Sequence, residues 1–278
     1  MKFAIYHRER EYAREMGDPK LGEIDAVSKQ EAERVTAHLG ATGTIAVPIN
    51  VALPERKPLS AFLGRVILGD CVAVMQEMPS ESIDLVMTDP PYLVNYKPRD
   101  GRQCANDDND AWLEPSFREI YRVLKPNSFC ATFYGWPWVD KFMQVWKQCG
   151  FRPVSHLTWP KSHCSKEGYT AGHHEVGYLL AKGRPSRPQK LISDVLPWEY
   201  TGNPLHPNQK PVMAITPLIE AFSKPGEIVL YPFAGSGTTG EAASMLGRNY
   251  ILIEKAARVC ETARVRLRDW PIIDPSQT

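Results

Sequence analysis

The sequence predicts an α/β protein with a doubly wound, mostly parallel sheet, preceded by a small N-terminal α+β unit. From about residue 65 onward, short apolar runs rich in β-branched residues alternate with amphipathic stretches of helical length, a pattern typical of such a sheet. The chain has 278 residues and a hydrophobic content of 43%, enough to bury one full core. Two polar motifs directly follow apolar runs, where open α/β sheets place their sites. We therefore expect a main domain at residues 59–278 and a separate unit at residues 1–58.

The N-terminal unit carries its own short pattern. We expect strands at Phe3–Tyr6 and Thr44–Ile49, and between them a helix that starts at the capping box Ser28-Lys29-Gln30-Glu31 and ends at Gly40. Residues 1–58 contain nine basic and nine acidic side chains, so the unit has no net charge that would attract a phosphate backbone. The pattern indicates no function for it.

The main domain is expected to alternate strands and helices. The predicted strands are Val66–Leu68, Ser82–Met87, Ser128–Tyr134, Phe151–Trp159, His174–Lys182, Glu227–Tyr231 and Asn249–Ile253. The predicted helices are Cys71–Met78, which Asp70 could cap, Trp112–Leu124, Trp138–Cys149, Met213–Ser223, one that ends at Leu246, and Ala256–Arg268. The polar segment Lys97–Asp110 has no apolar periodicity, which is typical of a substrate lid or a disordered loop.

Composition narrows the classes of protein that fit. The sequence contains no run of about 18 apolar residues and its N-terminus lacks the apolar core of a signal peptide, so we expect a cytoplasmic protein without a membrane segment. The six cysteines show no C-x-x-C spacing, and the spacing of His163, Cys164, His173 and His174 fits no common metal site, so we expect no bound metal. The formal net charge is +1, so any surface that binds nucleic acid must be local.

The first motif, Asp89-Pro90-Pro91-Tyr92, stands at the end of the strand Ser82–Met87. Two consecutive prolines stiffen the backbone and supply no N–H, so their carbonyls are free to accept hydrogen bonds. Asp89 adds a carboxylate and Tyr92 an aromatic face, so a planar group bearing an NH₂ could donate to the acceptors while it stacks on the ring. An adenine or cytosine extruded from a nucleic-acid helix has this form. The alternative is a structural Pro-Pro turn with a capping Asp and a packed Tyr.

The second motif, Gly235-x-Gly237-x-x-Gly240, lies between a predicted strand and a predicted helix, and Glu254 stands at the end of the next strand. The glycines let a ligand approach the backbone, and an acid at that place can accept both ribose hydroxyls. The motif alone fits NAD, S-adenosylmethionine or simple tight packing. A P-loop is excluded because no Lys-Ser/Thr pair follows the glycines.

Several motifs occur in one order along the chain: Gly69-Asp70, Asp89-Pro90-Pro91-Tyr92, His206-Pro207-Asn208-Gln209-Lys210-Pro211 and Phe233-Ala234-Gly235-Ser236-Gly237-Thr238. In this combination the chain resembles the amino-methyltransferases of DNA, which transfer a methyl group from S-adenosylmethionine to an exocyclic nitrogen of adenine or cytosine. The resemblance spans about Arg65 to Arg268, and His173–Tyr178 is similar to the family's strand after the catalytic region. The catalytic motif precedes the cofactor motif, as in the β group of this family. The resemblance implies the class I S-adenosylmethionine-dependent methyltransferase fold with permuted motifs.

The resemblance also implies roles for individual residues. Catalysis would fall to Asp89, Pro90, Pro91 and Tyr92. The cofactor would be bound by Asp70, Asp89, His206, Asn208, Gln209, Lys210, Phe233, Ala234, Gly235, Ser236, Gly237, Thr238, Thr239 and Glu254. Within this set, Asp70 would meet the cofactor's adenine amino group and Glu254 its ribose, while Lys210 would close the pocket. One position departs from the family's pattern, because an acid usually precedes the Pro-Phe and here the residue is Tyr231.

The expected partner is double-stranded DNA. Residues 152–190 contain seven basic residues against two acidic ones, a local excess that could bind a phosphate backbone or could be an ordinary solvated surface. The residues expected to contact DNA are Lys97, Arg99, Arg102, Lys161, Lys166, Arg184 and Arg187. The region available for recognising the target sequence, about residues 160–203, is short for the family. Relatives in the β group often form dimers, so a homodimer is one expectation.

The resemblance favours N6 of adenine as the methylated atom because Asp, not Ser, stands first in Asp89–Tyr92. Cytosine N4 is the alternative within the family, and RNA is a weaker alternative substrate. Two alternatives come from other classes. A nicotinamide-dependent oxidoreductase would explain the glycines and Glu254 but not Asp89–Tyr92, and a DNA-binding module without catalysis would require a broken motif.

Overall fold

The computed structural model describes residues 2–7, 22–25, 44–48, 56–94, 109–165, 169–188, 190–200, 202 and 209–270, and it divides into two compact units, Met1–Glu55 and Arg56–Thr278. In the first unit, the described residues form the antiparallel strands β1 (Lys2–His7), β2 (Gly22–Asp25) and β3 (Thr44–Pro48), in the order β2-β1-β3. The sequence predicts β1 and β3 but not β2, whose four residues include a single large apolar side chain. The predicted helix from Ser28 to Gly40 lies outside the described residues.

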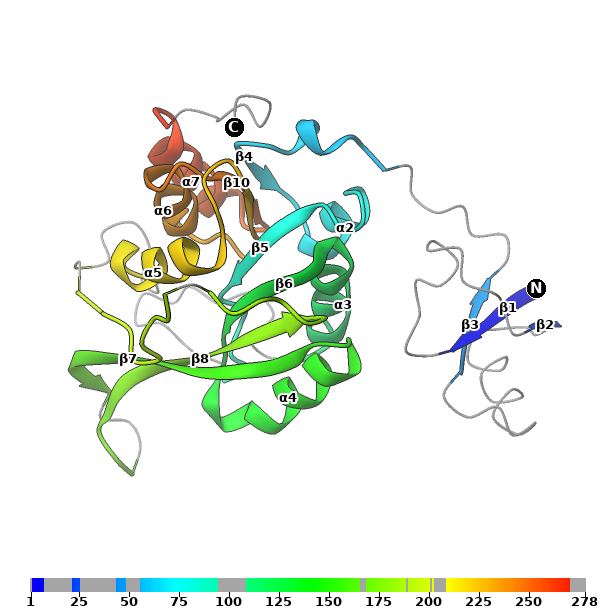
Figure 1. Ribbon diagram of the computed structural model, residues 1–278, viewed down its shortest axis with the longest axis horizontal. Coiled ribbons are helices and arrows are strands. Elements are labelled where there is room, and N and C mark those ends of the chain that lie inside the picture. The colour runs from blue at the N-terminus through cyan, green and yellow to red at the C-terminus, as the bar shows by residue number, and fades with distance from the viewer. Residues whose placement is uncertain are drawn as a thin grey trace. The chain divides into compact units, whose positions relative to one another are not determined.

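The second unit is built on the predicted mostly parallel sheet, with seven strands in the order β4-β10-β9-β5-β6-β8-β7 (Figure 1). Its strands are β4 (Arg65–Leu68), β5 (Ile83–Thr88), β6 (Leu124–Phe133), β7 (Arg152–Ser165), β8 (Gly172–Lys182), β9 (Ile228–Tyr231) and β10 (Asn249–Glu254). Strand β8 runs antiparallel to both of its neighbours, whereas β4, β10, β9, β5 and β6 pair in parallel. The strand order and pairing are those of the doubly wound, mostly parallel sheet that the sequence predicts.

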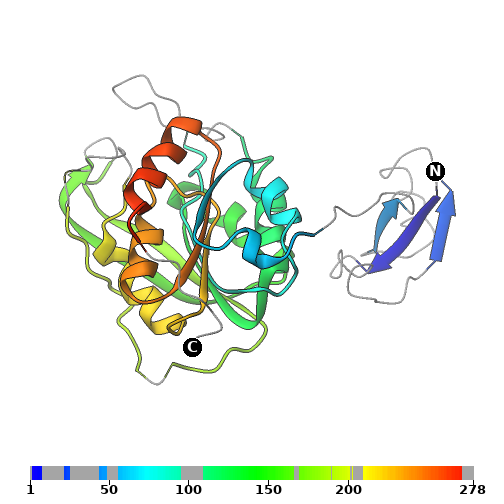
Figure 2. The same cartoon turned by 90° about the horizontal axis from the view of Figure 1, so that it is seen from above.

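Helices cover both faces of this sheet (Figures 1 and 2). The helices are α2 (Cys71–Gln76), α3 (Leu113–Val123), α4 (Val139–Gln148), α5 (Val212–Phe222), α6 (Thr238–Met245) and α7 (Ala257–Leu267), with short 3₁₀ turns at Leu59–Ala61 and Trp136–Trp138. The side chains of β10 show the two-layer arrangement. Ile251 and Ile253 join the core formed with α2, α3 and α4, while Leu252 joins the core formed with α5, α6 and α7. This alternation is what a sheet covered on both faces requires.

Two strands differ from their predicted bounds for physical reasons. Strand β6 starts at Leu124, four residues before the predicted start, because Leu124 pairs with Ile83 ahead of a register shift. Strand β7 extends past Trp159 to Ser165 although it contains Pro153 and Pro160. The prolines are tolerated because β7 lies at the edge of the sheet and its register shifts next to both of them. In the described part of the chain, no helix combines the length and apolar character needed to cross a membrane.

The order of the strands places both predicted motifs at the centre of the sheet. Strand β5, which ends in the first motif, pairs in parallel with β9, which ends in the glycine motif; Leu85 faces Val229 and Val86 faces Leu230. Since the strands are parallel, their carboxyl ends lie at the same edge. The two motifs are therefore direct neighbours in space, at the place where the order of the chain reverses across the sheet.

Candidate functional site

The carboxylate of Asp89 is the centre of the first motif. Asp89 directly follows β5, and both of its side-chain oxygens accept hydrogen bonds from the chain itself. The Tyr92 hydroxyl donates to Asp89 Oδ1 at 2.8 Å, and Lys210 Nζ donates to Asp89 Oδ2 at 2.6 Å. The predicted catalytic aspartate is thus held in a defined orientation by two donors, one from its own motif and one from Lys210, two residues before α5.

A glycine at the end of β6 fixes the backbone of the motif. A Cβ atom on Gly135 would lie 2.3 Å from the carbonyl oxygen of Tyr92, far inside van der Waals contact. Only glycine therefore permits the end of β6 to pack on the chain at Tyr92. The sequence prediction missed Gly135, although a glycine directly after an apolar strand was a signal for such a close approach.

Lys210 lies in an apolar and aromatic environment and has only 8% of its surface exposed. Its ammonium is 4.8 Å from the centre of the Phe133 ring and 5.5 Å from that of Tyr92, distances at which a cation is attracted to a ring face. Burying an ammonium is costly unless it is paired, and Asp89 supplies the pairing carboxylate.

A second acid, Glu175 on β8, belongs to the same cluster and was not predicted as a site residue. Lys161 on β7 donates to Glu175 Oε1 at 2.6 Å. Burial alone would raise the pKa of Glu175, but the positive charges of Lys210 and Lys161 lower it below its usual value. Charges therefore alternate from Lys161 through Glu175 and Lys210 to Asp89. The only sequence signal for Glu175 was its place in the family-like segment His173–Tyr178.

Two tyrosines complete this region: Tyr92 is partly buried and Tyr231 is buried. Burial, with the carboxylates of Asp89 and Glu175 nearby, raises the pKa of Tyr92 well above its usual value. Burial and the charge of Asp89 likewise raise the pKa of Tyr231, which has only 4% of its surface exposed. Both phenols therefore stay protonated at neutral pH. Tyr231 stands where the family usually has an acid, so this chain places a neutral donor between Asp89 and Glu254.

The three glycines of the second motif have different surroundings. Gly235 has a left-handed backbone with φ of 53°, and a Cβ there would meet no atom within 4 Å. Gly237 has φ of 85° and a Cβ there would lie 3.1 Å from Ala263 Cβ, while a Cβ on Gly240 would lie 2.7 Å from Leu252 and 2.8 Å from Leu267. Gly235 thus faces the open side where a ligand can approach, whereas the later glycines allow tight packing.

Glu254 closes this loop from the end of β10. Its Oε2 accepts from the Gly235 N–H at 2.9 Å and its Oε1 from the Ala256 N–H at 2.8 Å. Burial raises the pKa of Glu254, and these N–H donors act in the opposite direction. Each carboxylate oxygen keeps lone-pair capacity for a further donor, so ribose hydroxyls can bind there.

Asp70, at the end of β4, serves as the helix cap that the sequence predicts. Its carboxylate accepts from the N–H groups of Val72 and Ala73 at the start of α2, and it lies 3.3 Å from the ammonium of Lys255. Gln209 is buried next to Lys210, and its Oε1 has no hydrogen-bond partner within the described part of the chain. A buried acceptor without a donor fits the approach of a ligand N–H. The residues present therefore fit an adenosine cofactor with a free amino group.

Other predicted site residues take different places. Phe233 packs edge-on against Trp112 with ring centres 5.5 Å apart, and the Ala234 N–H bonds to the Ile253 carbonyl. The hydroxyl groups of Ser236 and Thr238 accept hydrogen bonds from Arg266 on α7, a residue that the sequence prediction missed.

Only some of the residues predicted to contact DNA belong to the part of the chain that the structure describes. Arg184 and Arg187 are exposed, and Lys161 is largely buried in its pair with Glu175. Lys182, one of the seven basic residues counted between 152 and 190, is also buried and donates to the carbonyls of Tyr121 and Leu124. The local excess of surface charge is therefore smaller than the sequence count suggests. The predicted site residues that lie outside the described ones are Lys97, Arg99, Arg102, Lys166, His206 and Asn208.

Among the residues that the structure describes, no three His, Cys, Asp or Glu side chains come together as a metal site.

A family model described as N6_N4_Mtase, DNA methylase, matches residues 83–265 of the chain. The chain is also 49% identical over 205 residues to the Escherichia coli (strain K12) protein named "Putative methylase YubD", a match that covers 74% of this chain and 90% of that protein.

Solved structures share the fold. The M1.HpyAVI–SAM complex aligns with a TM-score of 0.59 at 22% identity, over 73% of this chain and 98% of that one. The PvuII DNA methyltransferase, described as cytosine-N4-specific, aligns with a TM-score of 0.62 at 16% identity, over 81% of this chain and 93% of that one. At these identities the matches establish a common architecture.

Proposed function

The chain belongs to the N6_N4_Mtase family of DNA methylases, and from this we propose that it methylates the exocyclic N6 of an adenine that has left the DNA duplex. S-adenosylmethionine is the methyl donor of the reaction, and when bound it supplies an electrophilic methyl group on sulfur. The proposed substrate is double-stranded DNA in the cytoplasm.

One observation carries the proposal: the acceptor motif and the cofactor loop stand on adjacent parallel strands. The pairing of β5 with β9 sets Asp89 beside the strand that leads to Gly235. A base amine bound at Asp89 would therefore lie next to a cofactor bound over the glycine loop. A methyl transfer requires this proximity, because the two reacting atoms must approach in line.

The residues of the first motif supply the acceptors that such a reaction needs. An exocyclic amine is a poor nucleophile because its lone pair is delocalised into the ring. The Asp89 carboxylate and the Pro90 carbonyl would accept its two N–H bonds, which favours a pyramidal nitrogen with a directed lone pair. Transfer would form the N–CH₃ bond as the donor's C–S bond broke, and Asp89 would accept the proton that the nitrogen loses and pass it to water.

Asp89 is engaged before any base arrives, and this shapes how the base binds. Tyr92 donates to Oδ1 of Asp89 and Lys210 donates to Oδ2, so one lone pair on each oxygen is already occupied. A carboxylate has about four acceptor positions, so an amine can bind while at least one of these contacts persists. We propose that Lys210 keeps Asp89 oriented, and that the ring of Tyr92 stacks on the extruded base.

We assign the cofactor to the groups around the glycine loop. Glu254 would hold the ribose, Asp70 would meet the adenine amino group, and the backbone at Gly235 would approach the methionine part. The side-chain oxygen of Gln209, which has no hydrogen-bond partner among the described residues, would accept an N–H of the cofactor. Arg184 and Arg187 are proposed to contact the DNA backbone, since both are exposed.

The test is methyl transfer from labelled S-adenosylmethionine to unmethylated genomic DNA, followed by separation of the nucleosides. We expect label in N6-methyladenine. Label in N4-methylcytosine would mean that the reaction is the same but the target base is cytosine. Label in a parallel assay with cellular RNA, with none in DNA, would mean that the substrate is RNA. The Asp89→Ala variant is the matched control: it should lose transfer and still bind the cofactor. Binding of NADH in place of S-adenosylmethionine would overturn the proposal.

A further inference from the structure

Arg266, in the last turn of α7, reaches across to the glycine loop and the first turn of α6. Its Nη1 donates to Thr238 Oγ1 at 2.9 Å, to the Ser236 carbonyl at 3.3 Å and to Ser236 Oγ at 3.4 Å. Its Nε donates to Glu241 Oε2 at 2.5 Å. One side chain thus binds a residue of the loop and two residues of the helix that follows it.

The charge of Arg266 is neutralised within this group. Its side chain is 11% exposed and that of its partner Glu241 26%, so the ion pair is largely shielded from water. The pair therefore offers little attraction to a distant anion such as DNA phosphate. A guanidinium holds its donors in a rigid plane, which suits it to fixing several acceptors in one geometry.

The packing of the glycines points to the same side of the loop. Gly237 lies against Ala263, and Gly240 lies against Leu267, so both rest on α7, the helix that carries Arg266. A Cβ on Gly235, by contrast, would meet no atom within 4 Å in the described part of the chain. The loop is therefore fixed to α7 on one side and open on the other, where the cofactor is proposed to bind.

Such a loop needs an external support. Gly235 and Gly237 both adopt left-handed backbone conformations, and glycine loses more conformational freedom than other residues when it is ordered. Gly237, the cap residue of α6, has no side chain that could bond to the free N–H groups of that helix. If the loop were not ordered in advance, the cofactor would have to order it on binding and its affinity would fall.

We propose that Arg266 is a positioning residue that holds the glycine loop in its cofactor-binding conformation before S-adenosylmethionine binds. The inference rests on the proposed function, because it assigns the loop to that cofactor. Arg266 acts through Ser236 and Thr238 and contacts no reacting atom. Its loss should therefore raise the dissociation constant and the KM for the cofactor, and leave kcat at saturating cofactor nearly unchanged.

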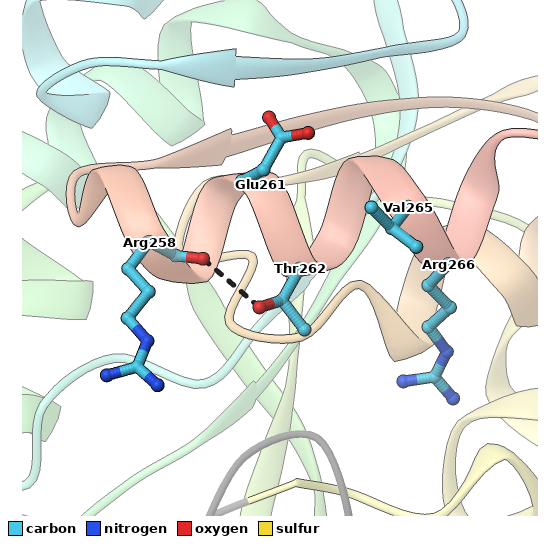
Figure 3. A pocket seen from close by; sticks show the side chains of 5 residues that line it. All are labelled: Arg258, Glu261, Thr262, Val265 and Arg266. Atoms are coloured by element: carbon cyan, nitrogen blue, oxygen red, sulfur yellow. Dashed lines mark hydrogen bonds between the residues drawn. The ribbon is translucent and has the colours of Figure 1, made fainter.

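The same helix offers a matched control. Arg266 lines a shallow surface pocket of about 590 Å³ on α7 together with Arg258, Glu261, Thr262 and Val265 (Figure 3). Arg258 is exposed and carries the same charge about two turns earlier in the helix. Substituting Arg258 removes an arginine from α7 and from this pocket without touching the glycine loop.

The experiment measures the affinity of the full chain for S-adenosylmethionine by calorimetry, in the wild type and in the Arg266→Met, Arg266→Lys and Arg258→Met variants. We expect Arg266→Met to bind about tenfold more weakly and Arg258→Met to bind as the wild type does. The affinity of Arg266→Lys should lie between those of the other two variants. Lysine keeps the positive charge near Glu241 but lacks the planar guanidinium that donates to several acceptors at once. Methyl transfer at saturating cofactor then separates KM from kcat.

A double-mutant cycle keeps the test decisive where Arg266→Met loses fold stability. Thr238→Val removes the acceptor at the first residue of α6, where the glycine loop ends, so the effects of Thr238→Val and Arg266→Lys on cofactor affinity should be less than additive. Full additivity, or wild-type affinity in the folded Arg266→Met variant, would overturn the inference while the proposed function stands. Absence of S-adenosylmethionine binding in the wild type would overturn both.

Discussion

Lys210 Nζ lies 2.6 Å from Asp89 Oδ2, although the two residues are 121 positions apart in the chain. Lys210 is 8% exposed, so the carboxylate replaces hydration that the ammonium has lost. On its other side, Lys210 is near enough to Glu175 to lower the pKa of that acid. The acidic group of the catalytic motif is therefore held by a buried cation that a second acid stabilises.

This contact predicts a catalytic defect in the Lys210→Met variant. Without the ammonium, Asp89 loses one of its two donors and much of its fixed orientation. We expect kcat for methyl transfer to fall about 100-fold, because a small displacement of an acceptor at a reacting centre has a cost of this order. The dissociation constant of S-adenosylmethionine should change by less than about threefold. Calorimetry and steady-state kinetics measure the two quantities separately.

Lys125→Met is the control for this variant. It breaks the salt bridge of 2.5 Å between Lys125 Nζ and Asp84 Oδ1. Asp84 lies near the start of β5, whereas Asp89 follows the end of that strand. In Lys125→Met, both kcat and the affinity for S-adenosylmethionine should stay close to their wild-type values. If Lys210→Met instead loses cofactor affinity and keeps kcat at saturation, Lys210 belongs to the cofactor pocket, as the family resemblance implies.

Tyr92 combines two functions that two substitutions can separate. Tyr92→Phe removes the hydroxyl that donates to Asp89 and keeps the ring, so we expect a loss of roughly 10- to 100-fold in kcat, because a hydrogen bond to a charged group contributes about 1.5–3 kcal/mol. Tyr92→Ala also removes the ring, and we expect a further weakening of about tenfold in the KM for DNA, since base stacking is worth roughly 1–3 kcal/mol. Equal activity of the two variants would show that the ring does not stack on the base.

The glycines of the second motif predict opposite effects of the same substitution. Gly235→Ala places a methyl group in open space but forces a left-handed backbone on alanine, at roughly 1–2 kcal/mol, and it obstructs the approach of the cofactor. Gly240→Ala places its methyl group 2.7 Å from Leu252 and 2.8 Å from Leu267 in the core. We expect Gly235→Ala mainly to weaken S-adenosylmethionine binding, and Gly240→Ala mainly to lower the thermal midpoint, by about 2–6 °C. Calorimetry and thermal unfolding of both variants check this pair.

Local chemistry in the sequence was sufficient to predict the strands of the seven-stranded sheet, the Asp70 cap and the two motifs. Each of these depends on residues that are close along the chain, such as the N–H groups of Val72 and Ala73 that the Asp70 carboxylate accepts. The strand β2 was missed because its four residues carry almost no apolar signal.

The supporting residues depend on pairings that a single sequence does not encode locally. Glu175 meets Lys161 because β7 and β8 pair antiparallel, and Arg266 meets Thr238 because α7 returns to the start of α6. Lys210 was assigned from its motif, yet its contact with Asp89 follows from the long connection between β5 and α5. In each case the partner is set by tertiary packing, which neither periodicity nor composition reveals.

The charges around Glu175 predict how the stability of the fold depends on pH. Lys210 and Lys161 outweigh burial and lower the pKa of Glu175 below its ordinary value of 4.5. A depressed pKa in the folded state means that ionised Glu175 stabilises the fold above about pH 4.5, and that this contribution is lost as the pH falls through the folded pKa. At pH 7 we therefore expect Glu175→Gln to be less stable than the wild type and to unfold at a lower thermal midpoint.

The difference between the wild type and Glu175→Gln should shrink as the pH is lowered from about 4.5 toward 3, because the wild-type carboxylate is then protonated as well. Glu261→Gln is the matched control, since Glu261 is 64% exposed and its nearest cation, Arg264, lies 3.7 Å away. Thermal unfolding across this pH range should show that the difference in midpoint between the wild type and Glu175→Gln narrows. Glu261→Gln should have the midpoint of the wild type at each pH. A gap that stays constant with pH would mean that Glu175 stabilises the fold by packing and not by its charge.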